Sequence, residues 1–196
     1  MGFVAPDEHR AAELLLRSYL PGDGAELNRA VRQSFQHLRR FMPWAQPEPA
    51  VEQSEQVARR FRAQWLLGET EWVVSVWRDR RLVAGSGFHL RGRPLEDGVA
   101  DIGMWVRADE AGRGLGTRVL AAMVDWADAG WPFYKLTWRC DGRNTASARV
   151  AEKCGFALEG RLREDAPDHQ DPSYRPDTLL YGLLPFDERP WKRAGS

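Results

Sequence analysis

The chain has 196 residues, 43% of them hydrophobic, and its 28 Lys and Arg side chains balance 28 Asp and Glu side chains. This hydrophobic content excludes a disordered chain, and the zero formal net charge excludes a strongly basic nucleic-acid-binding protein. A chain of this length is expected to form a single domain over residues 1–196, with a packed core from about 13 to 184.

The scattered distribution of cysteines and histidines argues against a metal site. Cys140 and Cys154 do not form a CxxC pair, and none of the 4 His lies at the spacing of metal ligands. The first ten residues are charged and lack the apolar stretch of a signal peptide, and no stretch is long enough to cross a membrane. We therefore expect a cytoplasmic protein whose partners include neither nucleic acid nor a membrane.

Hydrophobic periodicity and turn residues predict eleven elements along the chain. The first is a strand at 14–19, and Asp23 with Glu26 then forms a start similar to a capping box for a helix that ends before Pro43. Next come a second helix, a hairpin of two strands joined by the turn Arg78–Arg81, another strand and another helix. A strand, a helix and two further strands complete the chain. The ranges of these later elements are 51–67, 72–77, 82–90, 101–106, 114–128, 134–140, 144–154, 156–162 and 178–184.

This order of elements predicts an α/β (α+β) fold with one mixed sheet. Short hairpin connections favour antiparallel pairing, so the sheet is expected to be mostly antiparallel, with about seven strands and about four flanking helices. Four segments combine Pro or Gly with charge and are expected to be flexible. They are residues 1–10, 91–98, 167–176 and the part after 185.

The segment Asp101–Leu120 carries the strongest functional signal. Gly112, Gly114 and Gly116 alternate between a predicted strand and a predicted helix. Glycine lets the backbone approach a ligand closely, and the free N–H groups and positive dipole at a helix start suit a phosphate or pyrophosphate.

Two common phosphate-binding motifs do not match this segment. The P-loop requires Gly-Lys, which does not occur here, and the dinucleotide motif GxGxxG requires a third glycine where this chain has Thr117 or Val119. A third type of phosphate loop and a glycine-rich turn without any ligand remain as alternatives.

The run Ala111–Gly116 resembles the pyrophosphate-binding motif of the GNAT superfamily of N-acetyltransferases, with Ala111 where that family has Arg or Gln. The segment Asn144–Gly160, with Asn-x-x-Ser, Gly-Phe and Glu-Gly, is similar to a second GNAT signature. Three further segments resemble the branch that acetylates the N-termini of ribosomal proteins. They are residues 39–44, 101–106 and 175–181, so that the resemblance extends over about 13–184.

The resemblance implies that acetyl-CoA is the co-substrate and implies which residues bind it. The backbone N–H near Val106 is expected to meet the oxyanion, where the family's strand carries a bulge. Asn144 is expected to cap its helix as well. The expected cofactor-binding residues are Trp105, Val106, Arg113, Gly114, Gly116, Thr117, Arg118, Asn144, Ser147 and Arg149.

The resemblance also implies direct transfer to an amine, without an acyl-enzyme, so Cys154 is expected to be a buried structural residue. Many GNAT enzymes use a Tyr as the acid that protonates the leaving thiolate; here that position is Ala151, and Ser147 is the expected acid. The alternative for Ser147 is a hydrogen bond to the carbonyl four residues earlier in its helix. The base position corresponds to Ala166, so Glu164, with Asp165 beside it, is the nearest candidate, and a surface carboxylate is the alternative.

The expected acceptor is a protein or peptide N-terminal amine, bound near Phe41 and Trp44. At pH 7, deprotonating an α-amine costs about 1.4 kcal/mol and deprotonating a lysine about 4.6 kcal/mol, so the α-amine needs only a modest base. A small amine, such as an aminoglycoside, and a non-catalytic role in binding acyl-CoA are the alternatives. Whether the chain forms a homodimer is left open by the sequence.

Overall fold

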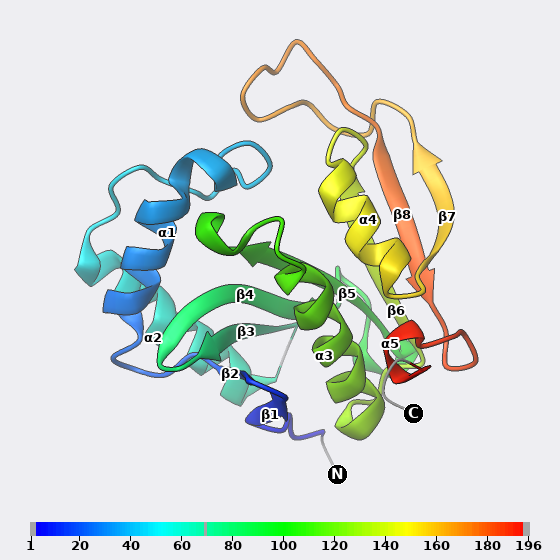
Figure 1. The fold of residues 1–196 in the computed structure, drawn as a ribbon, viewed down its shortest axis with the longest axis horizontal. Coiled ribbons are helices and arrows are strands. Elements are labelled where there is room, and N and C mark those ends of the chain that lie inside the picture. The colour runs from blue at the N-terminus through cyan, green and yellow to red at the C-terminus, as the bar shows by residue number, and fades with distance from the viewer. Residues whose placement is uncertain (1–2, 69, 194–196) are drawn as a thin grey trace.

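One eight-stranded sheet forms the centre of the computed structural model, which describes residues 3–68 and 70–193 (Figure 1). The strand order is β1-β2-β3-β4-β5-β6-β8-β7, and β5–β6 is the one parallel pair among the strand pairs described. The strands are β1 (Glu8–Ala11), β2 (Leu14–Ser18), β3 (Glu71–Arg78), β4 (Arg81–His89), β5 (Val99–Val106), β6 (Lys135–Asp141), β7 (Ala157–Leu162) and β8 (Thr178–Leu183).

Helices cover the sheet and contribute to two clusters of buried side chains. The larger cluster lies between the apolar side of α3 and the strands, and it includes Leu120 and Met123. The smaller cluster includes Leu27 and Ala58, where α1 and α2 pack against the sheet. The helices are α1 (Gly24–Leu38), α2 (Val51–Leu67), α3 (Leu115–Gly130), α4 (Thr145–Lys153) and the short α5 (Pro190–Arg193). Within the described residues, no helix is both long and apolar enough to span a membrane.

The sheet opens between its two parallel strands, β5 and β6. β5 and β6 pair over three positions, from Val99↔Lys135 to Asp101↔Thr137, and then separate. Beyond this point β5 continues to pair with β4, and β6 continues to pair with β8. The two halves of the sheet therefore diverge toward the end of the molecule that carries the α1–α2 loop and the β7–β8 loop (Figure 1).

The predicted order of elements is confirmed, and the fold is the predicted mixed, mostly antiparallel sheet. The prediction that residues 1–10 are flexible is wrong for Glu8–Arg10, which together with Ala11 pair with β2 as an edge strand. Exposed Glu8 and Arg10 alternate with His9, which stacks on Trp126, and Ala11, which packs against the larger cluster, so side-chain packing adds to the backbone pairing. The first helix also ends earlier than predicted, at Leu38.

The capping box predicted at Asp23 is wrong. The carboxylate of Asp23 makes no cap hydrogen bond and instead accepts from both terminal nitrogens of Arg17, at 2.7 and 2.9 Å, and from the N–H of Leu20. A charged partner competes for the carboxylate and forms the stronger hydrogen bonds.

Candidate active site

The start of α3 presents free backbone donors. Gly112 and Gly114 adopt φ values of +74° and +77°, which favour glycine, and no side chain caps the helix. The first hydrogen bond in the helix runs from the N–H of Arg118 to the carbonyl of Gly114. The N–H groups of the three preceding helical residues therefore remain available to a ligand. This geometry fits the pyrophosphate of a coenzyme A molecule.

The third glycine of the motif has a packing role. A Cβ on Gly116 would lie 3.2 Å from Cγ2 of Val150 on α4 and 3.6 Å from Cε of Met104 on β5. Gly116 thus lets α3, α4 and β5 approach one another closely, which brings the start of α3 to the opening between β5 and β6.

The charged residues predicted near the coenzyme lie on the surface around this turn. Arg113, Arg118 and Arg149 are exposed. Arg118 donates a 3.4 Å hydrogen bond to the carbonyl of Arg113 and lies 3.4 Å from Glu13. The carbonyl of Thr117 accepts from the Sγ of Cys154.

Backbone groups of β5 face the gap where β5 and β6 separate. Arg107 donates its N–H to the carbonyl of Val83, so alternation along an antiparallel ladder turns the N–H groups of Met104 and Val106 away from β4 and toward β6. The β4–β5 register runs without a shift to Val106, so the bulge expected there is absent. The separation of β5 from β6, rather than a bulge, exposes the N–H of Val106.

Ser147 lies beside this gap at the start of α4. Asn144 caps the helix as predicted, because its side-chain oxygen accepts from the N–H of Ser147 at 3.1 Å. The hydroxyl of Ser147 accepts a 3.0 Å hydrogen bond from Nε1 of Trp138 on β6. With its oxygen held by the indole, Ser147 can direct its own proton to another acceptor. The sequence did not single out Trp138 as a positioning residue.

Trp105 turns away from the start of α3. Its indole lies across Gly85 on β4, where a Cβ would come within 2.2 Å of Nε1. The ring of Trp44, in the α1–α2 loop, meets it edge-on at a centroid distance of 6.0 Å. The side chain of Trp105 therefore lies with Trp44 on the predicted acceptor side, not with the predicted coenzyme-binding residues.

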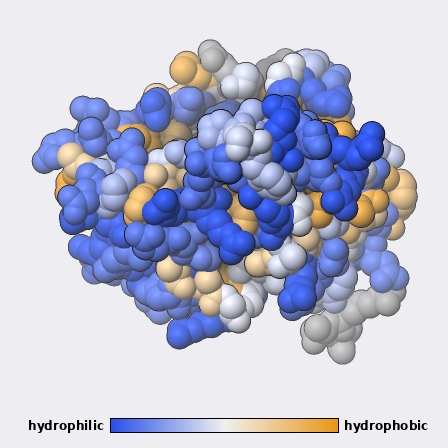
Figure 2. Space-filling model, turned by 90° about the horizontal axis from the view of Figure 1, so that it is seen from above, coloured by the Kyte–Doolittle hydropathy of each residue, from blue (hydrophilic) through white to orange (hydrophobic). Residues whose placement is uncertain are grey.

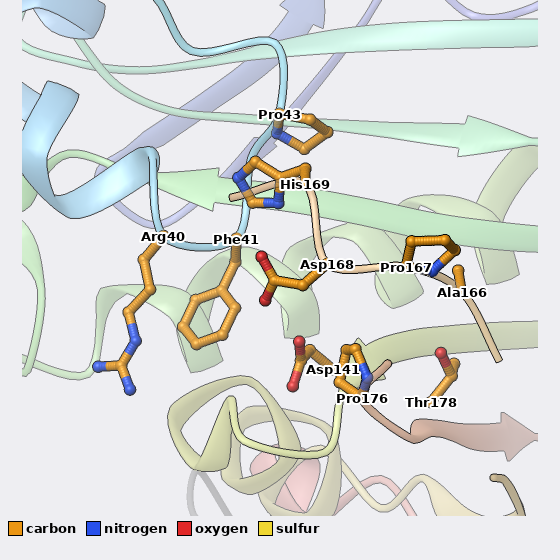
Figure 3. A pocket seen from close by; sticks show the side chains of 10 residues that line it. All are labelled: Arg40, Phe41, Pro43, Asp141, Ala166, Pro167, Asp168, His169, Pro176 and Thr178. Atoms are coloured by element: carbon orange, nitrogen blue, oxygen red, sulfur yellow. The ribbon is translucent and has the colours of Figure 1, made fainter. Parts of the chain in front are cut away.

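A pocket of about 220 Å³ lies between the α1–α2 loop and the β7–β8 loop (Figure 3). Phe41, a predicted substrate-binding residue, lines it, and the ends of β6 and β8 form its floor through Asp141 and Thr178. The remaining lining residues are Arg40, Pro43, Ala166, Pro167, Asp168, His169 and Pro176. The molecular surface at this end is mostly hydrophilic, with scattered hydrophobic side chains (Figure 2).

Glu164, the predicted base, does not line this pocket. It is exposed in a tight turn after β7, with φ +49°, and its backbone N–H donates to Asp177. The acidic residue of this loop that lines the pocket is Asp168, which is 7% exposed. No periodicity or motif along the chain marks Asp168, since it lies in a loop predicted to be flexible.

Arg143 links the two carboxylates of the pocket. It hydrogen-bonds to Asp141 and to Asp168, and its guanidinium lies 4.9 Å from the ring of Tyr174. The hydrogen bond from Arg143 lowers the pKa of Asp168 to about 2, and backbone N–H groups of the same loop act in the same direction. The hydrogen bonds with Asp141 and Asp168 raise the pKa of Arg143. The carboxylate of Asp168 is therefore held in the ionised form.

The two cysteines are buried thiols. Burial raises the pKa of Cys154 to about 12 and also raises the pKa of Cys140, which lies beside the hydroxyl of Ser147. Nucleophilic catalysis requires the thiolate, so these values argue against an acyl-enzyme at Cys154. Across residues 3–68 and 70–193, no group of three or more His, Cys, Asp or Glu is arranged to hold a metal ion.

Comparison with known proteins identifies the family. Residues 13–157 match the family model described as the acetyltransferase (GNAT) domain, and the chain belongs to this family. A curated relative, an uncharacterized N-acetyltransferase YjdG of Bacillus subtilis (strain 168), is 27% identical over 97 residues. That alignment covers 50% of this chain and 56% of the relative.

Solved structures with the same fold include three acetyltransferases. One is RimL, a ribosomal L7/L12 alpha-N-protein acetyltransferase in complex with coenzyme A, with a TM-score of 0.78, 18% identity and coverage of 89% of this chain and 95% of that chain. RimJ of Mycobacterium smegmatis has a TM-score of 0.77, 21% identity and coverage of 92% and 87%. The microcin C7 self-immunity acetyltransferase MccE, in complex with acetyl-CoA and AMP, has a TM-score of 0.78, 18% identity and coverage of 89% and 93%.

Proposed function

We propose that this chain transfers the acetyl group of acetyl-CoA directly to the α-amine of a protein or peptide N-terminus. The observation that carries the proposal is the placement of three features. The free donors at the start of α3 and the unpaired edge of β5 lie at the opening of the sheet, and the pocket lies between the two loops at the end toward which the sheet opens (Figure 1).

Each feature supplies one requirement of the reaction. Backbone N–H groups at the start of α3 bind the pyrophosphate, and the free edge of β5 binds the extended pantetheine arm as an added strand would. The N–H of Val106 faces the gap and stabilises the oxyanion that forms when the amine attacks the thioester carbon. Ser147, held by Trp138, protonates the leaving sulfur.

The chemistry of the pocket favours an α-amine over a lysine. An α-amine is deprotonated at a cost of about 1.4 kcal/mol at pH 7, and a lysine side chain at about 4.6 kcal/mol. Both carboxylates that line the pocket are bound by Arg143, so neither is a strong base. The fold that this chain shares with RimL, named as an alpha-N-protein acetyltransferase, supports the same acceptor class.

An assay of thiol release with acetyl-CoA tests this function against matched acceptors. The panel contains a peptide with a free N-terminal Ser or Ala, a peptide blocked at the N-terminus with one internal Lys, and an aminoglycoside. We expect release with the free N-terminus and little with the blocked peptide. Thiol release with the aminoglycoside alone would show that the acceptor is a small amine and not a protein N-terminus. Binding of acetyl-CoA without thiol release in the presence of any of these amines would indicate a non-catalytic acyl-CoA-binding protein.

A further inference from the structure

His169 is held at the rim of the pocket by a backbone carbonyl. Its Nε2 lies 2.8 Å from the carbonyl oxygen of Arg39, in the loop that follows α1. A carbonyl only accepts, so Nε2 carries the proton, and in the neutral ring the lone pair lies on Nδ1. Within the described part of the chain, Nδ1 of His169 has no hydrogen-bond partner and is therefore available to a ligand.

A neighbouring residue fixes the same loop without adding a titratable group. Nε2 of Gln170 donates to the carbonyls of Arg39 and Arg40, at 3.1 and 3.2 Å. The β7–β8 loop is thus tied to the α1–α2 loop across the mouth of the pocket. In Figure 3 the His169 ring lies between Pro43 and the carboxylate of Asp168.

The other titratable side chains near the acceptor position are poorly suited to accept a proton. Glu164 lies outside the pocket, and Arg143 binds both Asp141 and Asp168. A carboxylate whose pKa is held at about 2, as that of Asp168 is, takes up little proton at neutral pH. Imidazole, by contrast, changes its charge between pH 5 and 8.

We propose that His169 is the general base that accepts the proton of the acceptor amine. This inference rests on the proposed acetyl transfer and adds to it a catalytic residue that the sequence motifs did not indicate. The carbonyl of Arg39 orients the ring, in the way that a hydrogen-bond acceptor orients the base in other acyl-transfer enzymes.

In the proposed reaction, one proton leaves the acceptor before the C–N bond forms and a second leaves afterwards. Nδ1 takes one proton from the ammonium form of the acceptor and passes it to solvent, which leaves the nitrogen lone pair free. That lone pair forms the C–N bond at the thioester carbon, while the C=O electron pair moves to the oxygen. When the C–S bond breaks, the oxygen returns its electron pair and the sulfur leaves as the thiolate. The amine nitrogen loses a second proton, and the sulfur receives one, so the products are the amide, the thiol and one proton in solution.

Two carboxylates and one guanidinium line the pocket together with His169. Asp168 lies on the same loop, Asp141 at the end of β6, and Arg40 in the α1–α2 loop, while Arg143 in the β6–α4 turn binds both carboxylates. Arg143 holds the carboxylate of Asp168 ionised, because its hydrogen bond lowers the pKa of that group to about 2. An α-amine acceptor has an ordinary pKa of about 7.7–8.0 and produces an acidic limb of its own in the profile of kcat/KM, so kcat and rescue by imidazole carry the test.

The experiment compares His169→Gln with Gln170→Ala, and it uses whichever primary amine the wild-type protein acetylates. Glutamine in place of His169 retains an N–H donor for the carbonyl of Arg39 but cannot act as a base. We expect His169→Gln to lower kcat by about 10- to 100-fold. Gln170→Ala, which loosens the loop alone, should retain most of the wild-type kcat. Added imidazole should restore part of the activity of His169→Ala.

A wild-type kcat in His169→Gln would overturn the proposal, as would equal losses of kcat in both variants without rescue by imidazole. The tautomer offers a test that needs no acceptor. Nitrogen NMR of the neutral ring should show the proton on Nε2, and a proton on Nδ1 contradicts the proposal even if peptides prove not to be substrates. If the protein acetylates another amine but no N-terminal peptide, the proposed acceptor class is rejected. The comparison of His169→Gln with Gln170→Ala, made with that other amine, then still tests His169 as the base.

Discussion

At the scale of single residues, the hydrogen bond between Trp138 and Ser147 allows a catalytic role of Ser147 to be tested against a packing role. The sequence offered two interpretations of Ser147, an acid for the leaving thiolate or a hydrogen bond to its own helix. The structure shows a third partner, since Nε1 of Trp138 donates to the hydroxyl at 3.0 Å. Trp138 is 4% exposed, so its N–H has no ready access to water as an alternative acceptor.

Ser147→Ala should lower kcat by about 10- to 100-fold at saturating acetyl-CoA, because general-acid catalysis of a thiol departure contributes at the low end of its usual range. It should also lower the free energy of unfolding by about 1 kcal/mol, because the buried N–H of Trp138 loses its acceptor. Turnover and urea unfolding measure the two effects.

The matched control is Trp138→Phe, which removes the same hydrogen bond but retains the hydroxyl. It should cost a similar amount of stability and reduce kcat much less. If the two variants lose turnover equally, Ser147 acts through packing alone; full activity of Ser147→Ala would reject its role as the acid.

At the scale of elements, the close approach of α3 to α4 places the glycine-rich turn before α3 beside the gap in the sheet. Gly116 permits this approach, because a Cβ there would lie 3.2 Å from Val150. The β7–β8 loop forms the opposite side of the site and is held by Arg143 and by its contacts with the α1–α2 loop.

Gly116→Val should destabilise the protein by about 1–3 kcal/mol, because a larger side chain forces two packed helices apart. It should also weaken coenzyme A binding by displacing the donors at the start of α3. Thermal melting and calorimetry check the two outcomes. An unchanged melting temperature would show that α3 and α4 can move apart at Gly116 without loss of stability, which would contradict the packing role of this glycine.

Arg143→Gln should destabilise the protein in a pH-dependent way. The folded-state pKa of Asp168, about 2, lies below the ordinary value of about 3.9. A lowered pKa stabilises the fold above pH 4, and this contribution is lost as pH falls from about 4 toward 2. The difference in melting temperature between wild type and Arg143→Gln should therefore be at its largest at pH 6 and become smaller below pH 4.

Arg32→Gln serves as the control for this pH dependence, because Arg32 is exposed and has no ion pair among the described residues. Its melting temperature should follow that of the wild type at every pH. A difference for Arg143→Gln that stays constant down to pH 3 would contradict the assigned ion pair.

Elements with strong local signals could be predicted from the sequence, and long-range loop contacts could not. The glycines before α3 and the cap at Asn144 act through residues close to them in the chain, so short sequence patterns predict the turn and the cap. The contact between His169 and Arg39 joins residues 130 positions apart, with no periodicity on either side. For the same reason a loop expected to be flexible turned out to line the pocket.

At the scale of the whole molecule, the site exists because the sheet divides. The half containing β1–β5 carries α1 and α2, and the half containing β6–β8 carries the loop with His169 (Figure 1). Their divergence after Asp101↔Thr137 opens backbone donors to a ligand without breaking either half. Sequence resemblance predicted this fold, but the residues that line the pocket between the two loops required the three-dimensional arrangement.

The most direct test of the account is a calorimetric titration of coenzyme A into wild-type protein and Gly114→Asp. The substitution places a side chain and a negative charge where the proposed function places the pyrophosphate, so Kd should rise at least tenfold, or about 1.4 kcal/mol. Gly92→Asp provides the control, because Gly92 has a similar φ of +79° and open space around it but lies in the loop after β4. It should bind coenzyme A as the wild type does. An unchanged Kd in a folded Gly114→Asp variant would contradict the central claim that the turn before α3 binds the coenzyme.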